Sequence, residues 1–503
     1  MRENSILIKA VLSGGAAQVI GNVANILFVP LAITYLGATN YGAWIAILAI
    51  VNYLTLLQIG IGPALAAILA GNKAYGEQQK IIFESLKWLV FTGGIFFLST
   101  IIFGIFIGED FSRNVLGLKD LSGTAYAALC IMTIFYFLRH PISIFPSAFI
   151  GLQSIHWERL YAAILPPLIS LAALLIVGFS GAGLVELAYF TGGGLLIGSA
   201  VCGVHLFLKY PHLRFNPLDW KKFPRSTHPL LISGWRFFVI ALASSVVWGI
   251  DVLIIGYYLD AKSITAYSVT FKIFVAAYTI FIIVNSALWP MFGRAVSTND
   301  WGWVNSTYQK IINLMPVLGG LIWIGGILFA KPIIFIWTGP LGYAGELTVF
   351  SLGWYGYVFS MINTNSAFLG GINQTQKMMW AGVIEACIKV SLSIVFIAYF
   401  GLGGAAMGTA LAATLTLFWV LPRAIRIATK NEVIQSWNSI SRHFLILTPF
   451  LFASVYINSL EFDMYYFVWG LLVITLYLIC CWFTLDLRFI LKVRLGRKGG
   501  RLN

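Results

Sequence analysis

The stretch LYAAILPPLISLAALLIVGF, residues 160–179, contains not one charged side chain. An α-helix rises 1.5 Å per residue, so this stretch of about 20 residues is about 30 Å long as a helix, which is the thickness of the hydrocarbon core of a bilayer. Inside that core the backbone must satisfy its own N–H and C=O groups, and a single segment does so as a helix. The stretch therefore predicts a transmembrane helix.

Runs of the same kind fill most of the chain. Of its 503 residues 59% are apolar and only 10% are charged, whereas soluble domains carry about 25% charged residues. We predict an all-α membrane protein with about fourteen transmembrane helices. The expected spans are 11–36, 41–60, 89–107, 125–150, 160–179, 184–208, 230–258, 264–291, 311–336, 347–372, 379–400, 405–425, 444–460 and 465–485.

The segments between the spans are short and leave no room for a soluble catalytic domain. The first apolar run is too long for a cleaved signal peptide, contains Asn22 and Asn25, and lacks a small-residue cleavage site. The five Cys lie in apolar spans and the six His are scattered, so we expect no metal site and no cofactor.

Charge predicts the orientation. Most of the 32 Lys and Arg fall in segments on the same side as the N-terminus, whereas only Arg113, Lys119 and Lys262 fall on the other side. Because cytoplasmic loops carry the excess of Lys and Arg, both termini are expected in the cytoplasm. Contacts of these loops with anionic lipids explain the net charge of +14 without nucleic acid.

Short sequence patterns recur at a nearly constant spacing, which indicates an internal repeat. The paired patterns are Ser13-Gly14 with Ser233-Gly234, YLGATNYGAW (35–44) with YLDAKSITAY (258–267), FIGLQ (149–153) with FLGGINQ (368–374), and FSGAGL from Phe179 with FGLGGA from Phe400. Six spans per repeat is an even number, so both halves should have the same orientation and enclose a substrate path between them.

This repeat predicts five regions. Two pseudo-symmetric six-helix bundles cover residues 1–208 and 229–425, and a basic cytoplasmic linker, residues 209–228, joins them. Two further transmembrane helices lie in residues 426–485, and residues 486–503 form a basic cytoplasmic tail.

Charged residues inside the spans need a compensating contact, because an ionisable group in the bilayer core costs several kcal/mol unless it faces water or a partner. Glu385 and Lys389 are four positions apart and can neutralise each other on one helix face. Arg139, Arg236 and Lys272 have no such neighbour in their own spans.

These unmatched cations lie at different depths of their spans, with Lys389 near the middle of its own. One interpretation is a wet, cationic cleft that binds an anionic head group through Arg139, Arg236, Lys272 and Lys389. Arginine suits phosphate because its planar guanidinium makes two hydrogen bonds at once. The other interpretation, which stays open, is separate ion pairs between helices, for example with Asp251.

The chain also resembles the polysaccharide biosynthesis flippases of the O-antigen and capsule type, which share a superfamily with MATE drug exporters and the lipid II flippase. The resemblance covers about residues 5–430, with the span layout and the repeat. It rests on VPLAITYLGATNYGAWIAI (29–47), QIGIGPALAAILA (58–70), LWPMFGRA (288–295) and LGGINQTQK (369–377).

The resemblance implies that the protein carries an undecaprenyl-pyrophosphate-linked oligosaccharide across the bacterial inner membrane by alternating access. It also implies coupling to a gradient of H⁺ or Na⁺, for which Asp251 and Glu385 are the candidates, and contacts with other proteins of polysaccharide assembly.

Two other classes remain as alternatives. A MATE-like exporter of organic cations would need acidic residues in its cleft, and this chain offers few. A membrane enzyme, such as a polymerase or glycosyltransferase, is disfavoured because the longest outer loop, about residues 108–124, is short and no catalytic residues stand out.

Overall fold

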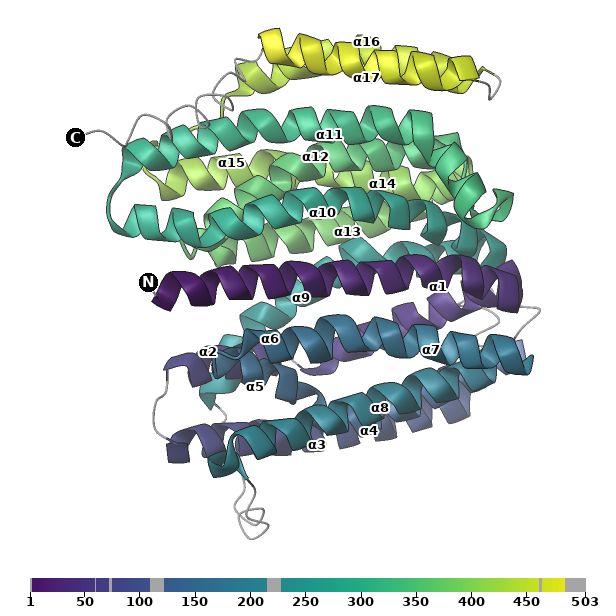
Figure 1. Cartoon of the computed structure of the whole chain (residues 1–503), viewed down its shortest axis with the longest axis vertical. Helices are drawn as coiled ribbons and strands as arrows, with labels where there is room; N and C mark the ends of the chain where they lie inside the picture. Colours follow the sequence, from purple (N-terminus) through teal and green to yellow (C-terminus); the bar gives the residue numbers. More distant parts are fainter. Residues whose placement is uncertain are drawn as a thin grey trace. The chain divides into compact units, whose positions relative to one another are not determined.

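The computed structural model describes residues 2–58, 60–71, 75–108, 122–214, 228–460 and 464–484, and within these ranges the regular elements are all helices. Eleven of them are long and apolar enough to cross a membrane, or twelve if a bent pair is one span. The all-α membrane fold is therefore confirmed, while the count of fourteen stays a prediction. By their internal contacts the residues form two compact units (Figure 1).

Unit 1 comprises residues 1–245 and 255–265. In it α4 packs along α8, α1 along α7 and α2 along α5. Its elements are α1 (Arg2–Leu54), η1 (Thr55–Gln58), α2 (Ile61–Gly71), α3 (Tyr75–Ile107), α4 (Ser122–Arg139), η4 (Pro141–Ile144), α5 (Phe145–Gly151), α6 (Ile155–Glu158), η5 (Arg159–Ile164), α7 (Leu165–Ser180), α8 (Leu184–Lys209), η6 (Pro211–Leu213) and most of α9 (His228–Tyr258).

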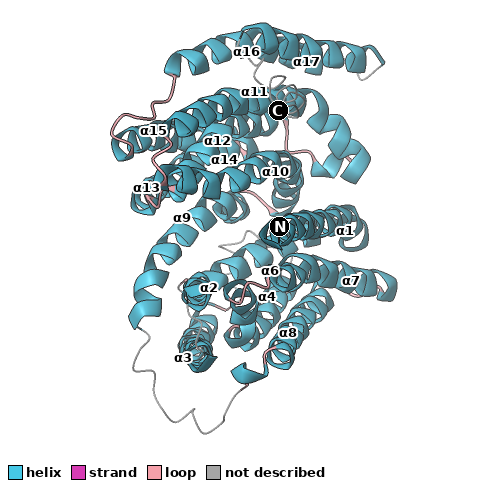
Figure 2. Ribbon diagram, turned by 60° about the vertical axis from the view of Figure 1, so that its left-hand side comes forward, coloured by secondary structure: helices cyan, strands magenta, loops and turns pink. Residues whose placement is uncertain are grey.

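Unit 2 comprises residues 246–254 and 266–503. In it α11 packs along α12, α13 along α14, and the last two helices along each other (Figures 1 and 2). Its elements are the middle of α9, most of α10 (Ala261–Ser297), α11 (Trp301–Thr338), η8 (Pro340–Gly342), α12 (Glu346–Gly371), α13 (Thr375–Phe400), α14 (Leu402–Leu415), α15 (Leu417–Ala428), α16 (Trp437–Asn458) and α17 (Met464–Thr484).

Several predicted spans differ from simple straight helices. The two predicted spans 11–36 and 41–60 lie on either side of Gly37, where a non-helical residue with φ +80° separates two helices within α1, and the second span runs on into η1. The predicted span 125–150 bends by 59° between α4 and the helical segment that begins at Pro141. The predicted span 405–425 is divided between α14 and α15 at Thr416. The predicted span 347–372 corresponds to the helix α12. It is not among the eleven helices counted above, because its glycines, tyrosines and polar residues make it less apolar.

Helix ends in the two units match at the spacing of the predicted repeat. After α5 the N–H of Ser154 donates to Phe149 O at 2.8 Å, and after α12 the N–H of Gln374 donates to Leu369 O at 2.8 Å. Such a bond closes a helix whose next residues turn into the left-handed region. Gly181 after α7 and Gly401 after α13 both have positive φ and are related by the same spacing as Ser154 and Gln374.

These matching ends support the predicted repeat. The five predicted regions themselves stay a prediction, and residues 215–227 of the linker and the whole tail 486–503 lie outside the described residues.

Candidate functional site

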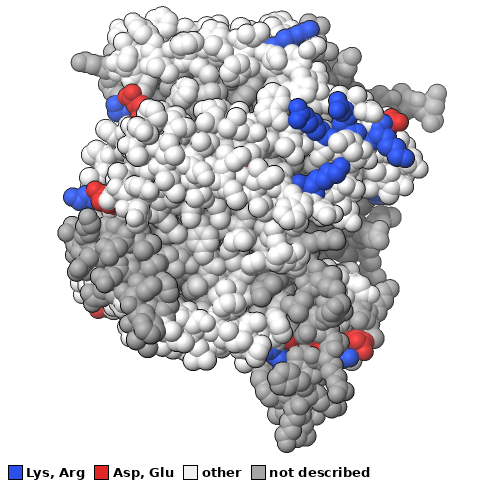
Figure 3. All heavy atoms as spheres, turned by 180° about the vertical axis from the view of Figure 1, so that it is seen from behind, with Lys and Arg blue, Asp and Glu red and all other residues white. Residues whose placement is uncertain are grey.

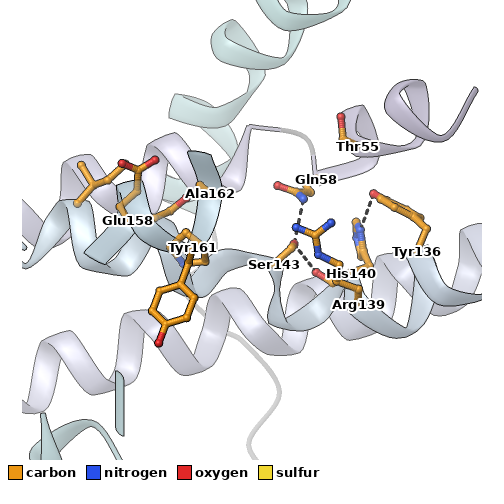
Figure 4. A pocket seen from close by; sticks show the side chains of 12 residues that line it. Thr55, Gln58, Tyr136, Arg139, His140, Ser143, Glu158, Tyr161 and Ala162 are labelled. Carbon is orange, nitrogen blue, oxygen red and sulfur yellow. Dashed lines mark hydrogen bonds between the residues drawn. The ribbon is translucent and has the colours of Figure 1, made fainter. Parts of the chain in front are cut away.

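Unit 1 contains a polar pocket of about 240 Å³. It is formed where three irregular segments meet: η1, the bend between α4 and η4, and the π-helical turn η5. Figure 4 shows Arg139, His140 and Ser143 close to Gln58, with Glu158 and Tyr161 across the pocket. We call it the unit 1 pocket, and it is lined by Thr55, Gln58, Tyr136, Arg139, His140, Ser143, Pro146, Ser147, Ile150, Glu158, Tyr161 and Ala162.

The bend in the pocket wall follows from Pro141. Proline has no N–H for the helix ladder, and its ring clashes with the carbonyl four residues before it. The helix α4 accordingly ends at Arg139, and η4 begins at Pro141. Broken helices at membrane depth are tolerated where they are buried in protein or line a polar cavity.

A chain of hydrogen bonds fixes the backbone around this bend. The amide of Gln58 donates to Ser143 Oγ at 2.9 Å, and Ser143 Oγ donates to the carbonyl of His140 at 2.6 Å. The hydroxyl of Tyr136 donates to the carbonyl of Leu54 at 2.6 Å and lies 2.9 Å from His140 Nδ1. The break is therefore held in one conformation by residues of α1, η1 and α4.

Arg139 supplies the positive charge of the unit 1 pocket. Its Nε donates to Ser199 Oγ on α8 at 2.7 Å, which anchors the guanidinium from one side. Among the described residues no carboxylate forms an ion pair with Arg139, since none lies within 4.0 Å of its guanidinium. A half-buried guanidinium without a carboxylate partner can receive a phosphate through two parallel hydrogen bonds.

Unit 2 contains a separate charged cluster, built from four helices. The Nζ of Lys389 on α13 lies 2.9 Å from Asp251 Oδ2 on α9 and also donates to the carbonyl of Val247. Tyr267 on α10 donates to the same carboxylate oxygen at 2.7 Å, and Thr409 on α14 lies 3.3 Å from it. We call these residues the Asp251 cluster.

The Asp251 cluster is almost closed to solvent. Lys389 is 1% exposed and Asp251 is 3% exposed, and Glu385, one turn before Lys389 on α13, is 4% exposed. Buried charges of this kind persist only when they are paired and hydrogen-bonded. Among the described residues, Oδ1 of Asp251 has no hydrogen-bond partner, so the carboxylate has one further oxygen able to accept a hydrogen bond.

Comparison with known proteins shows which family the chain belongs to. Residues 7–296, more than half of its length, match the family model described as polysaccharide biosynthesis protein. The chain belongs to this family. It is 26% identical over 409 residues to the "Putative O-antigen transporter" of Salmonella typhi, with 77% of this chain and 88% of that protein covered.

Solved structures share the fold of this polysaccharide biosynthesis protein. The lipid II flippase MurJ in its inward closed conformation matches with a TM-score of 0.72 at 14% identity, over 94% of this chain and 99% of that one. An inward-facing MATE family multidrug resistance transporter matches with a TM-score of 0.63 at 16% identity, over 82% of this chain and 95% of that one. The resemblance predicted from the sequence is thereby confirmed.

The four predicted head-group residues of this polysaccharide biosynthesis protein lie in different surroundings. Arg139 lines the unit 1 pocket. Lys389 belongs to the Asp251 cluster, where its ammonium pairs with Asp251. Lys272 is half-buried on α10, and Arg236 lies on α9 with its side chain outside the described residues. Their common role in one cleft stays a prediction.

Most of the pocket around Arg139 was not predicted from the sequence. Gln58, His140, Ser143 and Glu158 were not predicted to belong to a site. The sequence does contain one indication of this site: Pro141 lies inside an apolar span, directly after Arg139 and His140.

Among the described residues, no group of three or more His, Cys, Asp or Glu could hold a metal ion.

Proposed function

We propose that this protein flips a lipid-linked oligosaccharide, whose head group is a pyrophosphate, from the cytoplasmic to the outer leaflet of a bacterial inner membrane. It acts as a transporter and not as an enzyme, in the assembly of O-antigen, capsule or exopolysaccharide. Its family, its similarity to a putative O-antigen transporter of Salmonella typhi and the fold shared with a lipid II flippase support this function.

The observation that carries the proposal is the environment of Arg139. A guanidinium placed at a broken span, beside hydroxyl and amide groups and without a carboxylate partner among the described residues, suits a phosphate ester in a low-dielectric setting. Gln58 lines the same pocket, and its amide has a second N–H, beside the one bonded to Ser143, for a neutral hydrogen bond to a phosphate or sugar oxygen. The lipid tail remains in the bilayer while the head group enters the protein.

The same geometry argues against the exporter of organic cations. A cationic substrate needs an acidic group that is free to accept it. In the described parts of the chain, Asp251 is occupied by Lys389, and Glu158 is paired with Arg159 at 3.5 Å. The MATE-like alternative therefore fits these residues less well than the flippase does.

The Asp251 cluster is our candidate for coupling to an ion gradient. It combines a buried carboxylate, a buried ammonium and a phenol within hydrogen-bond distance, which are groups that exchange protons. Because the ammonium of Lys389 already occupies Asp251 Oδ2, protons suit the cluster better than Na⁺. Glu385 lies one turn away and belongs to the same proposal.

The decisive experiment replaces Arg139 in a strain that lacks the chromosomal gene. Arg139→Ala should abolish surface glycan and should leave the lipid-linked oligosaccharide in the cytoplasmic leaflet, while the protein inserts at normal levels. Lys262→Ala is the matched control, because Lys262 is an exposed cation of the same unit. Normal surface glycan in the Arg139→Ala strain would refute the proposed role of the unit 1 pocket.

A direct transport assay separates flipping from synthesis. Purified protein in vesicles should move a fluorescent undecaprenyl-pyrophosphate-linked sugar to the opposite leaflet, and an imposed pH gradient should accelerate the movement more than a Na⁺ gradient. Extrusion of a cationic dye with no movement of the lipid-linked sugar would instead support the exporter.

A further inference from the structure

A second concave site lies on unit 2, apart from the Asp251 cluster. It is a groove of about 500 Å³ between α13 and the α14–α15 segment, within the range of roughly 300–1,000 Å³ that is typical of ligand pockets. We call it the α13–α15 groove. It is lined by Lys377, Trp380, Ala381, Ile384, Ile388, Leu415, Thr416, Val420, Arg423, Ala424 and Ile427.

The α13–α15 groove is apolar along its length. Trp380, Ile384 and Leu415 are each more than half exposed, and so is Ile427. In a membrane protein such side chains face hydrocarbon, so a concave apolar surface is filled by lipid chains and not by water.

The charges of the groove are confined to one end. Of the described residues that line it, Lys377 and Arg423 are the charged ones, and both are exposed. Lys377 lies at the start of α13, before its apolar residues, and Arg423 lies in the second half of α15, after Leu415 and Val420. Figure 3 likewise shows Lys and Arg gathered in one region of a face that is otherwise nearly uncharged.

The length of the groove matches one leaflet. From Lys377 to Ile388 along α13 the rise is about 16 Å. Half of a hydrocarbon core is about 15 Å thick. Both cations are also among those that the charge distribution assigns to the cytoplasmic side, where the anionic lipids are concentrated.

We propose that the α13–α15 groove is a binding site for an anionic phospholipid, with one acyl chain along the apolar wall and the phosphate between Lys377 and Arg423. Trp380 lies one turn inside the charged end, at the depth where indole rings meet the glycerol region of a lipid. Ile384 and Ile388 contact the chain. Such a lipid would pack against the exposed face of α13 and stabilise the position of this helix, whose buried residues include Glu385 and Lys389.

The test measures lipid binding by quenching of Trp380. The full-length protein is placed in phosphatidylcholine nanodiscs that contain a small fraction of brominated phosphatidylglycerol or, in parallel, brominated phosphatidylcholine. Subtracting the signal of Trp380→Phe isolates this residue from the other tryptophans. We expect phosphatidylglycerol to quench Trp380 at much lower mole fraction than phosphatidylcholine.

Variants of the two cations decide whether the site is specific. Lys377→Ala and Arg423→Ala should each weaken phosphatidylglycerol binding about fivefold, and together they should remove the preference over phosphatidylcholine. Arg426→Ala is the matched control, because Arg426 is an exposed cation of α15 that does not line the groove. It should leave the preference intact.

Two results would overturn the proposal. One is equal quenching by the two brominated lipids in the unaltered protein. The other is an equal loss in Arg426→Ala and in the groove variants, which would show a diffuse attraction between surface charge and anionic lipid. Native mass spectrometry of the same proteins counts retained phosphatidylglycerol and gives a second readout if Trp380→Phe fails to fold.

Discussion

The Nζ atom of Lys389 lies 2.9 Å from Oδ2 of Asp251, although the two residues are far apart in the chain. Four helices contribute to the cluster around this contact, so one ion pair ties together α9, α10, α13 and α14. Both charges are buried, so each is stable in the interior of unit 2 because the other neutralises it.

The first prediction concerns the loss of one partner of this pair. Asp251→Asn should destabilise the purified protein by about 3–5 kcal/mol, because it leaves the ammonium of Lys389 buried without a counter-charge. The double variant Asp251→Leu with Lys389→Met should recover most of this loss, since well-packed apolar residues replace a buried pair at little cost. Thermal unfolding in detergent measures both. Equal melting temperatures for the single and double variants would contradict the prediction.

The second prediction concerns the orientation of Arg139. Ser199→Ala removes the acceptor of its Nε hydrogen bond and should lower the rate of glycan transport about fivefold, which corresponds to one ordinary hydrogen bond. Arg139→Lys should lower it much further, because an ammonium lacks the planar fork. The control is Ser391→Ala, whose hydroxyl donates to a carbonyl of its own helix. A full transport rate in Ser199→Ala would show that Ser199 does not position the guanidinium.

Hydropathy was sufficient to predict the fold because the bilayer imposes one simple rule on every span. An uncharged run of about 20 residues that crosses the bilayer in such a chain forms a helix, because only a helix satisfies its backbone groups within one segment. What hydropathy could not predict is where helices bend. Pro141 and Thr416 interrupt predicted spans, and each interruption depends on a local backbone conformation that apolar composition does not encode.

The candidate site was only partly predictable, for a related reason. Arg139 stood out because a charge in an apolar run is costly. Gln58 and Ser143 did not, because uncharged polar residues occur throughout membrane helices and their proximity arises only from the bend at Pro141. Helix periodicity suggested Glu385 as the partner of Lys389, while an ion pair between helices with Asp251 was only an open alternative, and helix packing brings Asp251 to Lys389.

The third prediction tests whether the bend is required. Pro141→Ala restores a backbone N–H and removes the clash with the carbonyl four residues before it, so α4 should continue past residue 141 without the bend of 59°. We expect the protein to remain folded and to lose most of its surface glycan, because Ser143, which follows the bend, would move away from Gln58 and Arg139. Pro449→Ala in α16 is the control, since Pro449 also lies inside a helix but far along the chain from the pocket residues.

Unchanged surface glycan in Pro141→Ala would show that the bend is dispensable. A loss in both proline variants would point to a general effect on insertion, which immunoblotting of the membrane fraction separates from a loss of transport.

The fourth prediction concerns the close packing of α1 against the start of α10 in unit 1. A Cβ added to Gly42 would overlap the carbonyl oxygen of Ala261, and Thr265 Oγ1 donates to Ala38 O at 2.6 Å in the same contact. Gly42→Ala must therefore push the two backbones apart, and it should cost about 1–3 kcal/mol, as overpacking does. Melting temperature in detergent reports the change.

Gly94→Ala is the matched comparison for this glycine. Gly94 lies inside α3 with nothing described within 4 Å of an added Cβ, so alanine gains helix propensity there and should stabilise the protein by about 0.5–1 kcal/mol. The two variants add the same methyl group and should shift the melting temperature in opposite directions. A rise in both would mean that the backbones at Gly42 are not in contact, and the hydrogen bond from Thr265 to Ala38 would then be the next contact to test, with Thr265→Val.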